Sequence, residues 1–226
     1  MKLAGLLSGG KDSVYAAHHA QTHGHTLTHL VSLRSQNPDS YMFHTVNIDL
    51  TRLQAQAWNT PYIIAETPGV KEKELQDLKK ALEPLEVDGV ITGAIASQYQ
   101  AQRIDRLCEE LGLHHYHPIW GINREKLLHD MLESGMKIIF TTVAAHGLDK
   151  TWLGETLTPE RVTQLRKLNE KYQVDMAGEG GEYESLVIDA PWFNQRIKII
   201  SAEKTWDGVS GRYNITEATL YPKTTT

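Results

Sequence analysis

The sequence predicts an α/β protein in which residues 1–118 form a mainly parallel sheet and residues 119–226 form a smaller α+β domain. Short apolar runs alternate with helix-compatible segments, which is the spacing of βαβ units. The first apolar run ends at Ser8-Gly9-Gly10, and a helix-compatible stretch follows at once. After Pro118 the pattern changes to fewer helices and to strands that lie close together in the sequence.

Residues 1–118 contain the repeated strand and helix pattern. The expected strands are 2–7, 27–33, 61–65, 87–92 and 114–118, and the expected helices are 12–22, 48–58, 70–82 and 97–111. Gly24 and Gly112 follow two of these helices, as is common at helix C-termini. In parallel sheets ligands bind outside the carboxyl ends of the strands. We therefore expect the loops 8–13, 34–44 and 93–100 to converge there.

Residues 119–226 are expected to close a second domain with antiparallel strands. The expected helices are 124–133 and 159–172, and the expected strands are 136–145, 185–189, 197–200 and 213–221. Thr158 is a plausible N-cap for the second of these helices. The tail 223–226 is expected to fray.

Composition limits the possible functions. The 226 residues carry a net charge of −5, with 40% hydrophobic and 23% charged residues, as in ordinary globular proteins. No apolar run approaches the roughly 20 residues that span a bilayer, and the first apolar run ends in a glycine turn unlike a signal peptide. We expect a cytoplasmic protein without membrane contact. Cys108 is the only cysteine, which excludes paired-thiol chemistry, and the lack of a basic cluster argues against a large tRNA-binding surface.

The segment Ser8-Gly9-Gly10-Lys11-Asp12-Ser13 has the composition of an anion-binding turn. A turn between a strand and a helix points backbone N–H groups and the positive end of the helix dipole at one place. Two glycines let an anion approach the backbone, and Asp12 offers a carboxylate for Mg²⁺. The pattern from Gly5 to Lys11 is not a P-loop, because Asp12 stands where a P-loop needs Ser or Thr.

Three further segments carry candidate chemistry. In the segment 93–103, Ser97 can cap a helix and Arg103 can reach a phosphate or a carboxylate, although a capped helix with a surface arginine is an equal alternative. The segment 178–184 combines three glycines with three carboxylates, which suits a metal or a cationic group; the alternative is a solvated turn. The histidines of 114–117 are interpreted as solvated or hydrogen-bonded, and a metal site is the less favoured alternative.

Taken together these motifs resemble the diphthine–ammonia ligase family, whose first loop identifies it with the N-type ATP pyrophosphatases of the HUP-type, Rossmann-like superfamily. The resemblance covers nearly the whole chain. Its carriers are Ser8–Ser13, Ser40–His44, Gly93–Ile95 with Ser97, Tyr99, Gln100 and Arg103, Pro118–Trp120, Trp152–Gly154 and Gly178–Val187. The last run is the most family-specific; Ser185 departs from the threonine expected there but keeps the hydroxyl.

The resemblance implies that ATP activates the carboxylate of diphthine on translation elongation factor 2 and that ammonium then forms the amide, with release of AMP and pyrophosphate. The nucleotide and its Mg²⁺ would be held by Ser8, Gly9, Gly10, Lys11, Asp12, Ser13, Arg34, His44, Gly93, Ala94, Ser97 and Tyr99, with Asp12 on the metal. The second substrate would be bound by Arg103, Gly180, Gly181, Glu182, Tyr183 and Glu184. The catalytic groups would be Lys11, Asp12, Arg103, Glu182 and Glu184.

Two details of this interpretation concern the second substrate and the source of nitrogen. Glu182 and Glu184 are hypothesised to attract the trimethylammonium of diphthine or to bind ammonium, and Tyr183 to offer its ring face to the quaternary ammonium. Because the chain has no glutaminase domain, free ammonium is the predicted donor. Self-association is left open.

Two alternatives stay open. One is another adenylating ligase of the same superfamily that acts on a small carboxylate or on tRNA. The other is a sensor that binds ATP without chemistry. Pyrophosphate release in the presence of the modified factor would separate the sensor from the ligase.

Overall fold

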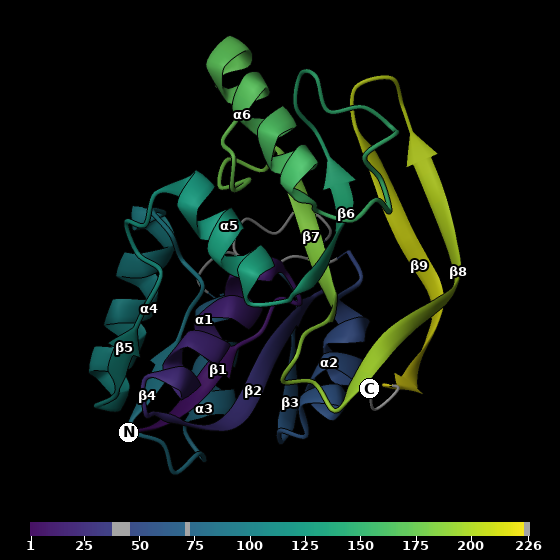
Figure 1. Cartoon of the computed structure of the whole chain (residues 1–226). Helices are drawn as coiled ribbons and strands as arrows, with labels where there is room; N and C mark the ends of the chain where they lie inside the picture. Colours follow the sequence, from purple (N-terminus) through teal and green to yellow (C-terminus); the bar gives the residue numbers. More distant parts are fainter. Residues whose placement is uncertain (38–45, 71–72, 224–226) are drawn as a thin grey trace. The chain divides into compact units, whose positions relative to one another are not determined.

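The computed structural model describes residues 1–37, 46–70 and 73–223, and these residues form two compact units, 1–121 and 122–226 (Figure 1). The boundary proposed from the sequence lies after Pro118. Each unit has its own sheet and its own buried apolar residues, so each is described by itself.

Unit 1 contains a five-stranded parallel sheet in the order β3-β2-β1-β4-β5 (Figure 1). Its strands are β1 (Lys2–Leu6), β2 (Thr26–Ser35), β3 (Tyr62–Thr67), β4 (Gly89–Ile91) and β5 (His114–Tyr116). Its helices are α1 (Lys11–Thr22), η1 (Ile48–Leu50, a 3-10 turn), α2 (Thr51–Trp58), α3 (Lys73–Leu82) and α4 (Gln98–Leu111). The α/β prediction is therefore confirmed.

The two faces of this sheet are covered by different helices. On one face, Ala4, Val31 and Val90 belong to a buried cluster with residues of α3 and α4, whose members include Leu78 and Leu107. On the other face, a side chain added at Gly5 would meet Leu27, Leu30 and Ala17 of α1. Because β1 is flanked by β2 on one side and β4 on the other, the chain reverses its direction across the sheet between β1 and β4. Ligands of open α/β sheets bind at this switch point.

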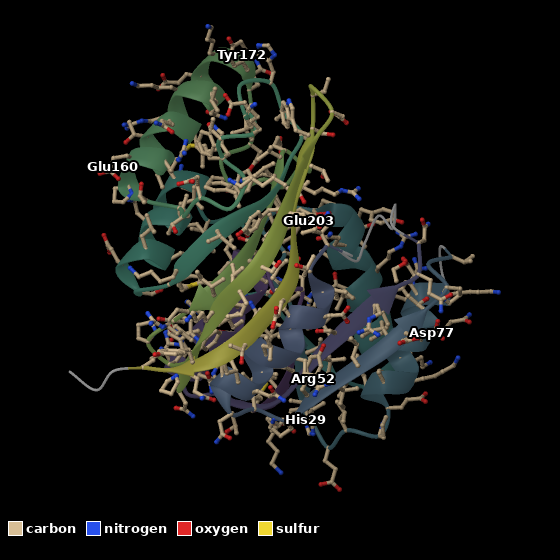
Figure 2. The ribbon with its side chains drawn as sticks, turned by 90° about the vertical axis from the view of Figure 1, so that its right-hand side faces the viewer. His29, Arg52, Asp77, Glu160, Tyr172 and Glu203 are labelled. Atoms are coloured by element: carbon tan, nitrogen blue, oxygen red, sulfur yellow. The ribbon has the colours of Figure 1, made fainter. Side chains whose placement is uncertain are left out.

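Unit 2 contains a four-stranded antiparallel sheet in the order β7-β6-β9-β8. Its strands are β6 (Lys137–Val143), β7 (Tyr183–Asp189), β8 (Gln195–Trp206) and β9 (Gly211–Pro222), and its helices are α5 (Arg124–Glu133) and α6 (Pro159–Tyr172). Figure 2 labels Glu160 and Tyr172 near the two ends of α6. The predicted cap is confirmed, because the Thr158 hydroxyl oxygen accepts a hydrogen bond from the Arg161 amide.

The core of unit 2 is built on β6. The Phe140 ring meets the rings of Trp152 and Tyr183 edge-on, with centroids 5.1 and 5.0 Å away. Leu127 and Leu128 of α5 are fully buried. This packing orders the segment that precedes β7, since Tyr183 is the first residue of that strand.

Several boundaries differ from those expected. The helix predicted over 48–58 begins as the 3-10 turn η1 and becomes α-helical only at Thr51. The strands predicted over 197–200 and 213–221 form a longer ribbon, 195–206 paired with 211–222. Among the described residues no helix is both long and apolar enough to cross a membrane.

Candidate active site

The turn after β1 has the backbone that its glycines predict. Gly9 has a positive φ of 88°, a conformation that residues with a side chain rarely adopt. Gly10 occupies the N-cap position of α1, and no side chain caps that helix. The first backbone bond of the helix runs from the Val14 amide to the Gly10 carbonyl at 3.2 Å. The amides of Asp12 and Ser13 therefore have no partner within the helix.

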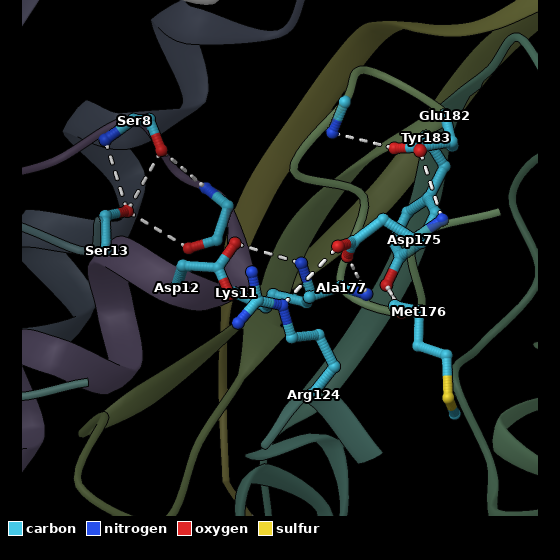
Figure 3. A network of polar contacts seen from close by, with 12 residues as sticks. Ser8, Lys11, Asp12, Ser13, Arg124, Asp175, Met176, Ala177, Glu182 and Tyr183 are labelled. Atoms are coloured by element: carbon cyan, nitrogen blue, oxygen red, sulfur yellow. Dashed lines mark hydrogen bonds and ion pairs between the residues drawn. The ribbon is translucent and has the colours of Figure 1, made fainter. Parts of the chain in front are cut away.

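Two serine hydroxyls tie the turn together (Figure 3). The Ser13 hydroxyl accepts from the Ser8 amide at 3.2 Å and donates to the Gly10 carbonyl at 3.0 Å, and it lies 3.1 Å from the Ser8 hydroxyl. The Ser8 hydroxyl in turn accepts from the Gly10 amide at 3.3 Å. The turn is thus held in shape before any ligand arrives, which lowers the entropy that a ligand would otherwise have to offset.

Lys11, which is buried, and Asp12, which is partly buried, form an ion pair beside this turn. The Lys11 ammonium lies 2.9 Å from Asp12 Oδ2, and the exposed fractions of the two side chains are 3% and 24% (Figure 3). Asp12 Oδ1 is also buried and has no hydrogen-bond partner among the described residues. A buried, unpartnered carboxylate oxygen calls for an explanation. A bound cation such as Mg²⁺ provides one, because Mg²⁺ prefers oxygen ligands.

Two contacts from other parts of unit 1 fix the turn in place. The buried Gln54 amide donates from Nε2 to the Gly9 carbonyl at 2.9 Å. Gly93, which follows β4, lies against the start of α1, so that an added Cβ would be 2.6 Å from both the Asp12 carbonyl carbon and the Ser13 nitrogen. The loops after β1 and β4 therefore meet at the switch point of the sheet, as the sequence predicts for two of its three converging loops.

The loop after β4 leads into α4 with the expected cap. Ser97 accepts a hydrogen bond from the Gln100 amide at 3.4 Å, which confirms the predicted N-cap. Arg103 lies over the ring of Tyr99, with its guanidinium carbon 3.8 Å from the ring centroid. Ala94 is buried. Arg103 and Tyr99 therefore act as one stacked pair one turn apart on α4.

The third loop is only partly described. Arg34, near the end of β2, forms ion pairs with Asp49 and, at 2.9 Å, with Glu66. Both carboxylates are mostly exposed, so these pairs are weak and leave the guanidinium able to change partner. The predicted nucleotide contact His44, like the whole of 40–44, lies outside the described residues.

In unit 2 the acidic segment 178–184 is an internally bonded loop and not a solvated turn (Figure 3). The Glu182 carboxylate accepts from the Asp175 amide at 3.0 Å and from the Gly180 amide at 2.8 Å. Gly178 has a φ of 77°, and a Cβ there would lie 2.7 Å from the Tyr183 carbonyl oxygen. The Glu182 carboxylate therefore holds its own loop, which is a different task from the predicted attraction of a cation.

The remaining residues of this segment differ in their accessibility. Tyr183 is 3% exposed, and its hydroxyl donates to the Met176 carbonyl at 2.7 Å. Its buried ring argues against the predicted contact with a quaternary ammonium. Glu184 is partly exposed and accepts from the Thr142 hydroxyl at 3.0 Å. Gly180 and Gly181 are exposed.

Two residues, one in each unit, support the predicted segments but were not predicted from the sequence. Gln54 is a buried amide on the predicted helix 48–58, and a polar side chain at a helix position that faces the core is the signal that could have indicated a specific partner. Arg124, at the start of α5, lies 3.4 Å from Asp175, which also accepts from the Ala177 amide at 2.8 Å. This pair supports the acidic loop, and its two residues are 51 positions apart, beyond the reach of any local pattern.

A Rossmann-like parallel sheet with a Ser-Gly-Gly-Lys-Asp-Ser turn at its switch point fits an ATP pyrophosphatase domain. Comparison with known families identifies the family of the chain. Residues 1–115 match the model described as the diphthamide synthase N-terminal domain, and residues 123–221 match the diphthamide synthase C-terminal domain. The chain belongs to the diphthamide synthase family.

Relatives in other organisms carry the name diphthine–ammonia ligase. The Danio rerio protein is 37% identical over 228 residues, which cover 91% of this chain and 88% of that protein. The Mus musculus protein is 36% identical over 226 residues, which cover 90% of this chain and 84% of that protein. The Schizosaccharomyces pombe protein is 35% identical over 90% of this chain, but the chain spans only 37% of its length. The family is thus one of ligases.

Proposed function

We propose that this chain uses ATP to activate the carboxylate of diphthine on translation elongation factor 2 and joins it to ammonium. The observation that carries the proposal is the turn Ser8–Ser13, which is preformed, lies at the switch point and leaves the amides of Asp12 and Ser13 without helix partners. Membership of the diphthamide synthase family supports the choice of substrate.

The chemistry requires a leaving group. Ammonia does not displace an oxygen from a carboxylate, so the carboxylate oxygen first attacks the α-phosphorus of ATP and the bond to the pyrophosphate oxygen breaks. Ammonia then attacks the acyl carbon of the adenylate, loses a proton, and AMP leaves. Catalysis of both steps rests on positioning and on stabilisation of charge.

Within unit 1 the residues of the turn are assigned to the phosphates. The amides at the start of α1 and the hydroxyls of Ser8 and Ser13 provide donors, and Lys11 provides positive charge. Asp12 would hold Mg²⁺, whose fit rests on its buried unpartnered oxygen. Bound Mg²⁺ would neutralise phosphate charge. The loss of one such donor typically lowers the rate by about 10²–10³.

The other predicted residues receive narrower roles. Gly93, Ala94, Ser97 and Tyr99 shape the second wall of the nucleotide site, and Arg103 is assigned to a phosphate or the substrate carboxylate. Arg34 and His44 are proposed for the nucleotide as well. In unit 2, Glu184 and the exposed backbone of Gly180 and Gly181 are assigned to the protein substrate, whereas Glu182 and Tyr183 keep the loop in shape.

The direct test is mass spectrometry of diphthine-modified elongation factor 2 after incubation with this protein, ATP and ammonium. We expect conversion of the acid to the amide together with stoichiometric AMP and pyrophosphate. Tight ATP binding without turnover would favour the sensor alternative. Pyrophosphate release with a small carboxylate but not with the factor would keep the ATP chemistry and reject the substrate.

Two variants test the site itself. Lys11→Ala should lower the rate by about 10²–10³, while Lys80→Ala, at a lysine whose side chain is 73% exposed, should act like the unmodified protein. Equal rates for the two variants would contradict the assignment of Lys11. Free ammonium is the proposed donor, and turnover with glutamine alone in a purified system would contradict that part.

A further inference from the structure

A cluster of metal-ligand side chains lies at the β5 edge of the sheet in unit 1. It consists of Asp105 on α4, His115 on β5 and His117 just after β5, two elements that lie side by side (Figure 1). One candidate ligand atom from each of these residues lies within 4.8 Å of the other two. His115 and His117 are two positions apart on an extended segment, so they share a face, which the sequence analysis overlooked by considering only adjacent histidines.

His115 is the buried centre of this cluster. Its side chain is 4% exposed, with Nδ1 2.6 Å from Asp105 Oδ1 and Nε2 2.7 Å from the Thr92 hydroxyl. These hydrogen bonds alone explain the arrangement of Asp105, His115 and Thr92.

His117 is not accounted for in this way. Its Nδ1 is buried and has no hydrogen-bond partner among the described residues. The ring lies edge-on to His115, with centroids 4.7 Å apart, and is tilted against Trp120 at 5.7 Å. A buried ring nitrogen beside a histidine and a carboxylate is an incomplete polar network, and such networks require a further partner.

We propose that Asp105, His115 and His117 bind a divalent transition-metal ion of the zinc type. The ion would replace the proton in the hydrogen bond between His115 Nδ1 and Asp105 Oδ1, and a ring nitrogen of His117 would complete three protein ligands. Two imidazoles and a carboxylate are a ligand set that zinc accepts, with a fourth position left for solvent. His115 Nε2 would then donate to the Thr92 hydroxyl, the kind of outer hydrogen bond that orients a metal-bound histidine.

The ligand atoms must shift for this to happen. Zinc lies about 2.0–2.2 Å from nitrogen and oxygen ligands, so two ligand atoms of a tetrahedral site are about 3.4 Å apart. His115 Nδ1 and Asp105 Oδ1, now 2.6 Å apart, have to separate. The wider spacing in the cluster, up to 4.8 Å, has to shorten by side-chain rotations. Asp105 can make them, because about half of its side chain is exposed. The site does not depend on the proposed ligase activity.

The test is a titration of the full chain, stripped with EDTA and kept in excess Mg²⁺, with Co²⁺ followed by its visible absorption and with Zn²⁺ by competition. We expect the protein to bind one equivalent of Co²⁺, with the visible absorption of a four- or five-coordinate ion. Thiolate charge-transfer bands should be absent, because no cysteine belongs to the cluster. His117→Ala and Asp105→Asn should weaken binding by about 100-fold or more, since even outer-shell changes cost about 10–100-fold.

The matched control is His114→Ala, at an exposed histidine on the same strand that is not part of the cluster. It should bind Co²⁺ like the unmodified protein, and Thr92→Val should weaken binding by about 10–100-fold. Zn²⁺ should raise the melting temperature of the unmodified protein and of His114→Ala by the same amount, and that of Thr92→Val, His117→Ala and Asp105→Asn by less. The proposal is overturned if the unmodified chain binds no stoichiometric Co²⁺, or if His117→Ala and His114→Ala bind it equally well.

Discussion

Replacing Gly93 by alanine tests whether the close approach of the loop after β4 holds the start of α1 in place. The added Cβ would lie 2.6 Å from two backbone atoms and 2.8 Å from the Asp12 carbonyl oxygen, whereas ordinary contacts begin at 3.4 Å. The difference, 3.4 − 2.6 = 0.8 Å, has to be absorbed by backbone. Gly93 has no positive φ, so the penalty is steric and not conformational.

We expect this variant to lose about 1–3 kcal/mol of unfolding free energy, the usual cost of overpacking. A displacement of this size at the phosphate-binding turn should also lower pyrophosphate release by about 10²-fold, because misplacement by about 1 Å has that effect. Urea denaturation measures the first quantity and coupled pyrophosphate detection measures the second.

Gly5→Ala is the matched control. Its Cβ would meet the ends of two flexible leucine side chains at 3.2 Å, so it should change stability by less than about 1 kcal/mol and leave activity intact. If Gly93→Ala matches Gly5→Ala in both assays, the two loops do not support each other and the reasoning fails.

Three further predictions concern other parts of the chain. Glu182→Ala should lower stability by about 1–3 kcal/mol because two loop amides lose their acceptor, whereas the exposed Glu203→Ala should have no effect in the same urea titration. Burial, and to a smaller extent the charge of the neighbouring His19, lowers the pKa of His18 to about 4. The unfolded chain therefore binds a proton more readily than the folded protein, and the free energy of unfolding should be highest above pH 6.5. It should fall by about 1–2 kcal/mol, after allowance for partial exposure, as the pH is lowered towards 4. His18→Gln should flatten that slope, and superimposable profiles would reject the assignment. Burial raises the pKa of the Cys108 thiol to about 12, so thiol reagents at pH 8 should label it only as fast as the fold opens; rapid labelling of the native protein would contradict this.

Local chemistry made much of the fold predictable. The glycine turn after β1 and the caps at Ser97 and Thr158 are encoded within a few residues, and they occur where the sequence places them. The strands β1 to β4 of unit 1 were predictable because each contains a short apolar run. The same locality explains much of the turn 8–13, since the hydrogen bonds of its two serine hydroxyls span at most five residues, whereas the bond from Gln54 to the Gly9 carbonyl spans 45.

What could not be predicted depends on distant contacts. Most residues of β8 beyond Ile200 are exposed and polar, so no apolar alternation indicated a strand there; its pairing with β9 supplies the order. Glu182 resembled a free ligand because its partners, the amides of Asp175 and Gly180, carry no side-chain signal. Tyr183 resembled a ligand platform because only the packing against Phe140 shows that its ring is covered.

The ribbon of β8 and β9 affects whether two copies of the protein can aggregate through their sheets. β8 ends the sheet of unit 2, and no further strand pairs with it among the described residues. An unpaired edge strand can form hydrogen bonds with a strand of another molecule, which is a first step of aggregation. Exposed Lys198 and Lys204, together with the register shifts around Ser201, place like charges and a twist along this margin. These features therefore oppose aggregation through the long edge strand β8.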